Sequence, residues 1–319
     1  MKNSICVLLI ISLILSMGIS VTHAQKTEET KGVVAISGAW ALYPMAVKWA
    51  EEFQKIYPNV KVDIGAGGAG KGMADALAGI VDIGMVSRDI YPQEIAKGAW
   101  WVAVTKDAVV PTINETNPAL KDLLAQGVKR ETFQGIWITG KTTTWSEVIG
   151  KKVNQQIHVY TRSDACGAAE IWAKFLGKNQ EDLLGIGVYG DPGLAEAVRK
   201  DVLGIGFNNI NYAYDPNTKR QIKGIQILPI DLNNNGLIDS DEKFYNTRDD
   251  IVNAIATGKY PSPPARDLYF VSHGKPNYPL VATFIKWVLT DGQKYVPEAG
   301  YINLSQEKLQ AQLKKLDGN

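Results

Sequence analysis

The sequence predicts an α/β protein with two lobes, and three observations support this. Short apolar runs alternate with stretches of helical periodicity, a pattern typical of α/β sheets. The apolar, β-branched run WWVAVTKDAVVPTIN (100–114) follows a complete strand–helix–strand set and indicates a crossover into a second lobe. A chain of 319 residues is also longer than one hydrophobic core usually needs.

The first lobe is predicted to comprise residues 25–108. Strands are expected over 32–37 (GVVAIS), 60–67 (VKVDIGAG) and 81–87 (VDIGMVS), and helices over 44–57 and 72–79. Because strands and helices alternate along the chain, we expect a parallel sheet.

The second lobe is predicted over 109–264, and residues 265–319 form a return segment that rejoins the first lobe. Within the second lobe we expect helices at 118–126 and 168–176, a Trp137–Val148 segment, and strands at 156–161 and 204–208. In the return segment we expect a strand near DLYFVSHGKP (267–276) and closing helices at 278–289 and 305–316.

The N-terminus has the features of a secretory signal peptide over residues 1–24. Lys2 precedes an apolar stretch over 5–19, and Thr22 and Ala24 are small residues suited to cleavage near Ala24–Gln25. We therefore expect a periplasmic or secreted protein. Removing Lys2 takes the formal net charge from +1 to 0, which argues against nucleic-acid or membrane-surface binding.

Residues 231–242, DLNNNGLIDSDE, match an EF-hand calcium loop position by position. Calcium requires six to eight hard oxygen ligands around a loop that doubles back, and Gly236 stands at the sharp turn. The predicted ligands are Asp231, Asn233, Asn235, the carbonyl of Leu237, Asp239 and Glu242. The alternative is a surface turn rich in Asn and Asp that binds no metal. No organic cofactor is expected.

Three segments share a design in which a strand ends in small residues and a helix begins at once: 36–41, 65–72 and 161–168. Each directs free backbone N–H groups and a positive helix end outward, which favours anion binding. The glycines of 65–72 imitate a nucleotide-binding loop, but Gly72 stands where a P-loop places Ser or Thr. Nucleotide binding is therefore not the expected function.

Five segments in order resemble the phosphate-binding proteins of Pst-type ABC importers: ISGAWALYP, GAGGAGKGMADALAGIVDIGMVSRD, ETFQGIWITGKTTTWSEVIG, TRSDACGAAEIWAKFL and YPSPPARDLYFVSHGKP. The resemblance implies the two-lobed type II periplasmic binding protein fold, with a ligand cleft between the lobes. It implies capture of inorganic phosphate or a similar oxyanion for an ABC permease, without catalysis, by a protein that we expect to be monomeric.

The resemblance also implies the ligand-binding residues, with Arg162 at the position of the family arginine, whose guanidinium suits an oxyanion. The set is Ser37, Gly38, Ala39, Trp40, Ala69, Gly70, Lys71, Arg88, Arg162, Cys166, Gly167 and Ala168. Ala39, Ala69, Cys166 and Ala168 replace hydroxyl residues of the family, and Arg88 occupies the usual place of an acidic acceptor, for which Asp164 is the alternative in this sequence. These departures bear on the identity of the anion.

Three other functions stay open from the sequence. The first is a receptor for a different small anion, and the second is a sensory or surface protein of the same fold. The third is an enzyme that uses Cys166 as nucleophile, because a thiol at a helix N-terminus has a lowered pKa.

Overall fold

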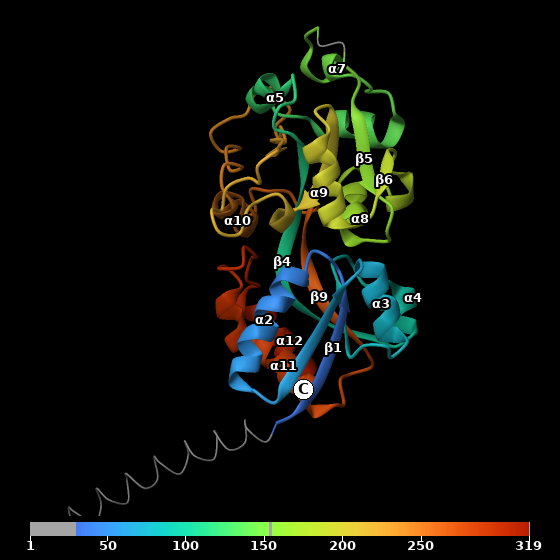
Figure 1. Ribbon diagram of the computed structural model, residues 1–319, viewed down its shortest axis with the longest axis vertical. Helices are drawn as coiled ribbons and strands as arrows, with labels where there is room; N and C mark the ends of the chain where they lie inside the picture. The colour runs from blue at the N-terminus through green and yellow to red at the C-terminus, as the bar shows by residue number, and fades with distance from the viewer. Residues whose placement is uncertain (1–29, 153–154, 319) are drawn as a thin grey trace, which may run out of the picture.

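The computed structural model describes residues 30–152 and 155–318. It contains two stacked lobes joined by long strands (Figure 1). The predicted signal peptide lies outside the described residues.

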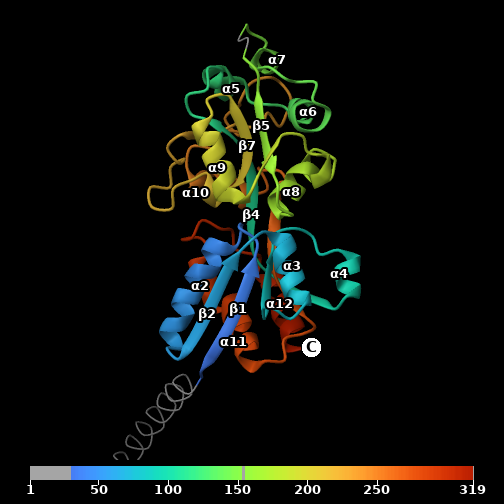
Figure 2. The same ribbon diagram turned by 45° about the vertical axis from the view of Figure 1, so that its right-hand side comes forward.

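Lobe 1 is built from the N-terminal third and the C-terminal segment of the chain. Its elements are β1 (Gly32–Gly38), α2 (Tyr43–Ile56), β2 (Val60–Ala66), α3 (Ala69–Leu77), β3 (Ile83–Val86), α4 (Pro92–Ala96), α11 (Pro279–Leu289) and α12 (Gln306–Asp317). Helices α2, α11 and α12 gather on one side of the lobe 1 strands, and α3 and α4 lie on the other side (Figures 1 and 2).

Lobe 2 holds the middle of the chain. Its elements are α5 (Leu120–Gln126), α6 (Arg130–Gln134), the π-helical turn Gly135–Thr139, α7 (Trp145–Ile149), β5 (His158–Arg162), α8 (Gly167–Phe175), β6 (Ile186–Val188), α9 (Gly190–Lys200), β7 (Gly204–Asn209), β8 (Ile225–Ile227) and α10 (Arg248–Ala256). Short 3-10 turns lie at 180–182 and 210–212 here, and at 291–295 in lobe 1.

Two strands, β4 (Ala99–Asn114) and β9 (Ala265–His273), connect the lobes. The strand order is β2-β1-β3-β9-β4-β7-β5-β6, with β8 beside β4. Strands β1, β2 and β3 are parallel, as are β5, β6 and β7, but β4 and β9 run antiparallel to their neighbours. The expected parallel sheet is therefore confirmed for β1, β2 and β3 but wrong for β4 and β9, because strands that cross between the lobes in both directions meet antiparallel.

Each lobe has its own hydrophobic core, and strand β4 contributes to both. Val102 and Val104 pack in the core of lobe 1, whereas Val109 and Val110 pack in that of lobe 2. From the C-terminal segment, Ile302 joins the lobe 2 core. The polar or charged side chains that β4 buries between these apolar groups, such as Asp107, therefore lie where the lobes join.

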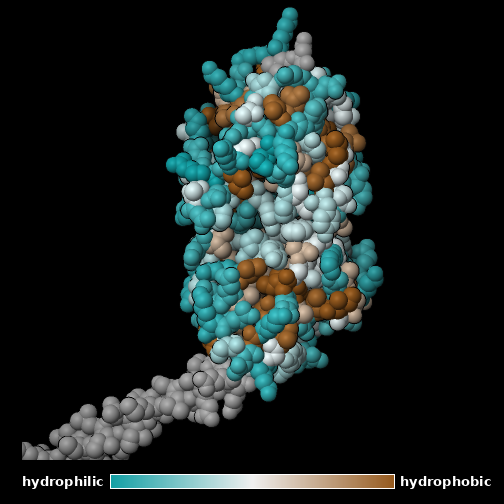
Figure 3. Space-filling view, in the orientation of Figure 1, coloured by the Kyte–Doolittle hydropathy of each residue, from teal (hydrophilic) through white to brown (hydrophobic). Residues whose placement is uncertain are grey.

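The surface agrees with this division. On the face shown in Figure 3, brown apolar residues form groups on both lobes, and a paler band of intermediate hydropathy lies between them. Among the described residues, no helix is both long enough and apolar enough to cross a membrane.

Candidate functional site between the lobes

Three loops at the carboxyl ends of β1, β2 and β5 meet where the lobes touch. The backbone N–H of Gly70 in lobe 1 donates to the carbonyl of Ala165 in lobe 2, at 3.0 Å. A Cβ atom at Gly70 would lie 2.8 Å from that of Ala165, and one at Gly167 would overlap the carbonyl oxygen of Ser87. Glycine is thus required at both positions for the loops to approach this closely.

The first loop is fixed by its own hydrogen bonds. Gly38 has a φ of +131° and lies so close to helix α3 that a Cβ atom would stand 2.7 Å from the Cα of Gly72. Its carbonyl accepts the N–H groups of Gly67 and Gly68, at 2.9 and 3.0 Å. The N–H of Ala39 donates to a carbonyl of β3, so the first two loops form one rigid unit.

Ser37 and Lys71 share one carboxylate, that of Asp75. The Ser37 hydroxyl donates to Asp75 Oδ2 at 2.7 Å, and the Lys71 ammonium pairs with the same oxygen. Burial would raise the pKa of Asp75, but these hydrogen bonds outweigh it and hold the pKa below its usual value. The structure therefore places Lys71 in a local ion pair beside the loops.

Arg162 lies at the end of β5 with a completely buried side chain, held by two carboxylates. Its Nε and Nη2 donate to the two oxygens of Asp164 at 2.8 and 2.6 Å, and its Nη1 donates to Asp191 at 2.6 Å. Burial opposes the charge of Arg162, but the two carboxylates outweigh it and raise the pKa. A guanidinium has five N–H groups, so one on Nη1 and one on Nη2 remain for a ligand.

The third loop ends in the helix α8. Cys166 caps the helix, since its Sγ accepts the N–H of Ala169 at 3.4 Å. Burial raises the pKa of this thiol to about 12, although Arg162 acts in the opposite direction. Ala168, like Ala69 at the start of α3, is buried in the core of its lobe.

Arg88 does not join Arg162. Its guanidinium forms two hydrogen bonds with Glu94, at 2.9 and 2.6 Å, lies 3.3 Å from Glu170, and stacks 4.4 Å from the ring centre of Tyr91. Two carboxylates thus balance the positive charge of Arg88.

A cavity of about 220 Å³ adjoins this cluster between the lobes. It is lined by Gly70, Arg88, Tyr91, Ala165, Cys166, Glu170, Asn179, Gln180 and Glu181. The lining has two acidic side chains and one basic side chain, and it does not include Arg162.

Trp40 spans the two lobes. Its ring packs at 6.3 Å and nearly perpendicular to Tyr189 of lobe 2, and its carbonyl accepts the hydroxyl of Tyr212 at 3.1 Å. Its indole Nε1 is buried and has no hydrogen-bond partner. Trp40 therefore packs where the lobes meet, and its indole Nε1–H is a hydrogen-bond donor without a partner.

Sequence reasoning missed a second buried arginine, Arg266, and its neighbour Asp107. They face each other across β4 and β9, with Arg266 Nη2 3.8 Å from Asp107 Oδ2. Arg266 also donates to the carbonyl of Ser87 at 3.2 Å and to the side chain of Asn209, while its Nη1 has no partner. Two adjacent charged residues interrupt or precede each apolar run, Lys106–Asp107 in one and Arg266–Asp267 in the other, and this was the signal that could have identified the pair.

Asp107 is fully buried, and neither of its carboxylate oxygens has a hydrogen-bond partner. Burial raises its pKa to about 7, which Arg266 only partly offsets. Burial also lowers the pKa of Arg266. The loss of hydration thus outweighs the mutual attraction of the two side chains.

Comparison with known proteins places the chain in a family. Residues 24–292 match the model of the PBP superfamily domain. The chain is 26% identical over 309 residues to protein SphX of Synechococcus elongatus, covering 92% of this chain and 84% of that protein. It is 25% identical over 316 residues to the phosphate-binding protein PstS of Pseudomonas aeruginosa, covering 92% and 89%.

Among solved structures, a substrate-binding protein of Clostridium perfringens with bound phosphate superposes with a TM-score of 0.70. The match has 22% identity and covers 86% of this chain and all of that one, so it shows a shared fold. The chain belongs to the PBP superfamily, has its two-lobed fold, and is similar to PstS proteins over most of its length.

Proposed function

We propose that this protein captures inorganic phosphate between its lobes and delivers it to an ABC permease. The observation that carries the proposal is the completely buried guanidinium of Arg162, which lies among the three loops and has two N–H groups without a partner. A buried guanidinium of this geometry suits a tetrahedral oxyanion, since its fork can contact two oxygens at once.

Other unused donors support an acceptor-rich ligand. Trp40 Nε1, Asn211 Nδ2 and Arg266 Nη1 are buried without a partner, on segments that meet between the lobes. Leaving such donors unsatisfied costs on the order of 1–3 kcal/mol each. An oxyanion has only acceptor oxygens and is the simplest ligand that would satisfy donors of this kind.

The carboxylates around Arg162 and Arg266 favour an anion that carries a proton. Asp164 and Asp191 contact Arg162, and the carboxyl group of Asp107 lies beside Arg266. Hydrogen phosphate can donate a hydrogen bond to a carboxylate oxygen, whereas sulfate would only be repelled. We therefore propose phosphate rather than sulfate, with other protonated oxyanions such as arsenate as the second candidate.

The proposed role in transport is based on similarity to known proteins. PstS proteins and SphX are similar over most of the chain, and the Clostridium perfringens protein was solved with phosphate bound. Export through the predicted signal peptide would place the receptor outside the cytoplasm, where an importer acquires its substrate.

A binding function is also more consistent with the state of Cys166 than catalysis is. A nucleophilic cysteine acts as a thiolate in an accessible position. Here the thiol is buried and its pKa is raised to about 12, so it stays protonated at neutral pH.

The proposal is tested with mature protein that has been unfolded, dialysed and refolded to remove bound ligand. Thermal unfolding is followed with phosphate, arsenate, sulfate, molybdate and organic phosphates, because a ligand of the native state raises the melting temperature. Phosphate should give the largest rise. A rise in melting temperature with another anion but none with phosphate would show that phosphate is not the ligand. No rise with any of these anions would contradict the proposed anion-receptor function.

A further inference from the structure

We propose that residues 231–242 of lobe 2 bind one Ca²⁺ ion, a function separate from anion capture. The ligands would be the side chains of Asp231, Asn233, Asn235, Asp239 and Glu242 and the carbonyl of Leu237. The site follows strand β8 and precedes helix α10, so it is carried by a single loop and not by a pair of helices.

A buried oxygen without a partner points into this loop. Asp231 is only 2% exposed, and its carboxylate oxygen Oδ1 has no hydrogen-bond partner. The other oxygen, Oδ2, accepts the N–H of Gly236 at 2.8 Å, which directs the carboxylate toward the centre of the loop. An unpaired carboxylate oxygen is costly to bury, and a cation would satisfy it.

Glu242 is the second buried carboxylate of the loop, at 3% exposed. Its Oε1 accepts the N–H of Leu232 at 2.8 Å and its Oε2 accepts that of Asp239 at 3.1 Å, so the carboxylate folds back over the loop. Glutamate at this last loop position is the usual two-oxygen ligand of such loops. None of Asp231, Asp239 and Glu242 is ion-paired with a basic side chain of the described residues.

The two asparagines of the loop contact Asp239. The amide Nδ2 groups of Asn233 and Asn235 donate to Asp239 Oδ2, at 2.9 and 2.8 Å. Both residues therefore lie on the same side of the loop as Asp239. In the described residues no three carboxylate, His or Cys side chains converge as a ready metal cluster, so calcium would draw these groups inward.

The backbone already follows the required turn. Asn234 and Gly236 have positive φ values of +62° and +81°. Lys129 contacts the loop at its rim, where its ammonium donates to the carbonyl of Asn234 at 2.8 Å. That carbonyl stands at the fourth loop position, which is not a ligand position.

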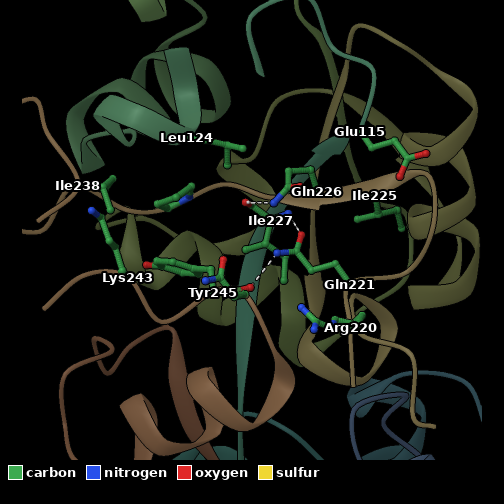
Figure 4. A pocket seen from close by; sticks show the side chains of 12 residues that line it. Glu115, Leu124, Arg220, Gln221, Ile225, Gln226, Ile227, Ile238, Lys243 and Tyr245 are labelled. Carbon is green, nitrogen blue, oxygen red and sulfur yellow. Dashed lines mark hydrogen bonds between the residues drawn. The ribbon is translucent and has the colours of Figure 1, made fainter. Parts of the chain in front are cut away.

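A bound ion would fix the loop onto the core of lobe 2. Ile238 donates its N–H to the carbonyl of Ala125 at 3.0 Å, and its side chain faces a cavity of about 600 Å³ together with Leu124 and Ile227 (Figure 4). Tyr245, just beyond the loop, lines the same cavity. Calcium therefore has a structural role here, holding Ile238 and the chain up to Tyr245 in place.

The test measures calcium binding directly on metal-free mature protein, by titration calorimetry and by terbium luminescence excited through nearby tyrosine. We expect one site with half-saturation on the order of 10⁻⁴–10⁻³ M, the range of extracellular calcium modules. Glu242→Gln should raise the half-saturation concentration by about tenfold or more, since calcium loses a two-oxygen ligand. Magnesium at the same concentrations should not compete.

The matched control is Asp241→Asn, which removes the same charge from an exposed neighbour outside the ligand positions. It should bind calcium as the unmodified protein does. Asp231→Asn provides a second loss-of-ligand variant in case Glu242→Gln folds poorly. Equal calcium binding by Glu242→Gln, Asp231→Asn and Asp241→Asn would overturn the proposal, as would no binding up to about 10⁻² M, well above the range for such sites.

Discussion

Arg162 and Asp164 are joined by two parallel hydrogen bonds, from Nε to Oδ1 at 2.8 Å and from Nη2 to Oδ2 at 2.6 Å. Asp164 therefore fixes the plane of the guanidinium. The same carboxylate accepts the N–H of Gly190 at 3.2 Å and would lie 2.9 Å from a Cβ atom at Gly68 of lobe 1. One pair of side chains thus links β5, α9 and the glycine loop of the other lobe.

Replacing Asp164 with Ala should destabilise the protein by about 1.5–3 kcal/mol, the range for hydrogen bonds to charged groups, because Arg162 keeps Asp191 as a partner. Chemical denaturation measures the change. The control is Glu196→Ala, which removes an exposed partner of Arg199 and should cost at most about 1 kcal/mol. Equal losses in both variants would contradict a fixing role for Asp164.

Replacing Gly167 with Ala should prevent full closure of the lobes. The added methyl group would overlap the carbonyl oxygen of Ser87, a backbone atom of the other lobe that cannot rotate away. Small-angle scattering with saturating phosphate should give a larger radius of gyration than for the unmodified protein. Gly65→Ala is the control, because a Cβ atom there meets no other atom within 4 Å. An unchanged radius in Gly167→Ala would show that the lobes do not close at this contact.

Asp107 should make stability depend on pH. Burial raises the pKa of its carboxyl to about 7 from a usual value of 3.8, so the folded state keeps a proton that the unfolded state releases. The free energy of unfolding should therefore fall as pH rises from about 4 to 7, by at most about 1.4 kcal/mol per pH unit for one group. Denaturation at several pH values measures this slope.

The Asp107→Asn variant should lose that part of the slope, whereas Asp63→Asn, which changes an exposed carboxylate paired with Lys61, should keep it. The pH profiles of all three proteins are compared in a buffer without phosphate. Identical profiles for the unmodified protein and Asp107→Asn would show that Asp107 is ionised throughout this range.

Much of the fold was predictable because local patterns determine it. The alternation of strands and helices placed β1, α2, β2 and β3 close to their observed positions, and the long apolar run was interpreted as a crossover. The direction of β4 and β9 was not predictable in this way. Their pairing joins residues about 160 positions apart, such as Asp107 and Arg266, and no local periodicity encodes that register.

The candidate site was likewise predictable only in part. The small residues of the three loops predicted that they meet, and Gly70 and Ala165 do contact each other. The partners of the charged residues were not predictable, because they depend on tertiary packing. Arg88 is paired with Glu94, six positions away on α4, while Arg266 comes to Ser87 from the other end of the chain.

The central claim is that Arg162 holds an oxyanion between the lobes. The most direct measurement is titration calorimetry of phosphate into ligand-free mature protein and into Arg162→Met, with Arg199→Met as a control for loss of an exposed arginine. Circular dichroism verifies that each variant is folded. We predict one phosphate per chain for the unmodified protein and for Arg199→Met, and a loss of about 2–5 kcal/mol of binding free energy in Arg162→Met. Phosphate binding of unchanged affinity by folded Arg162→Met would contradict the account.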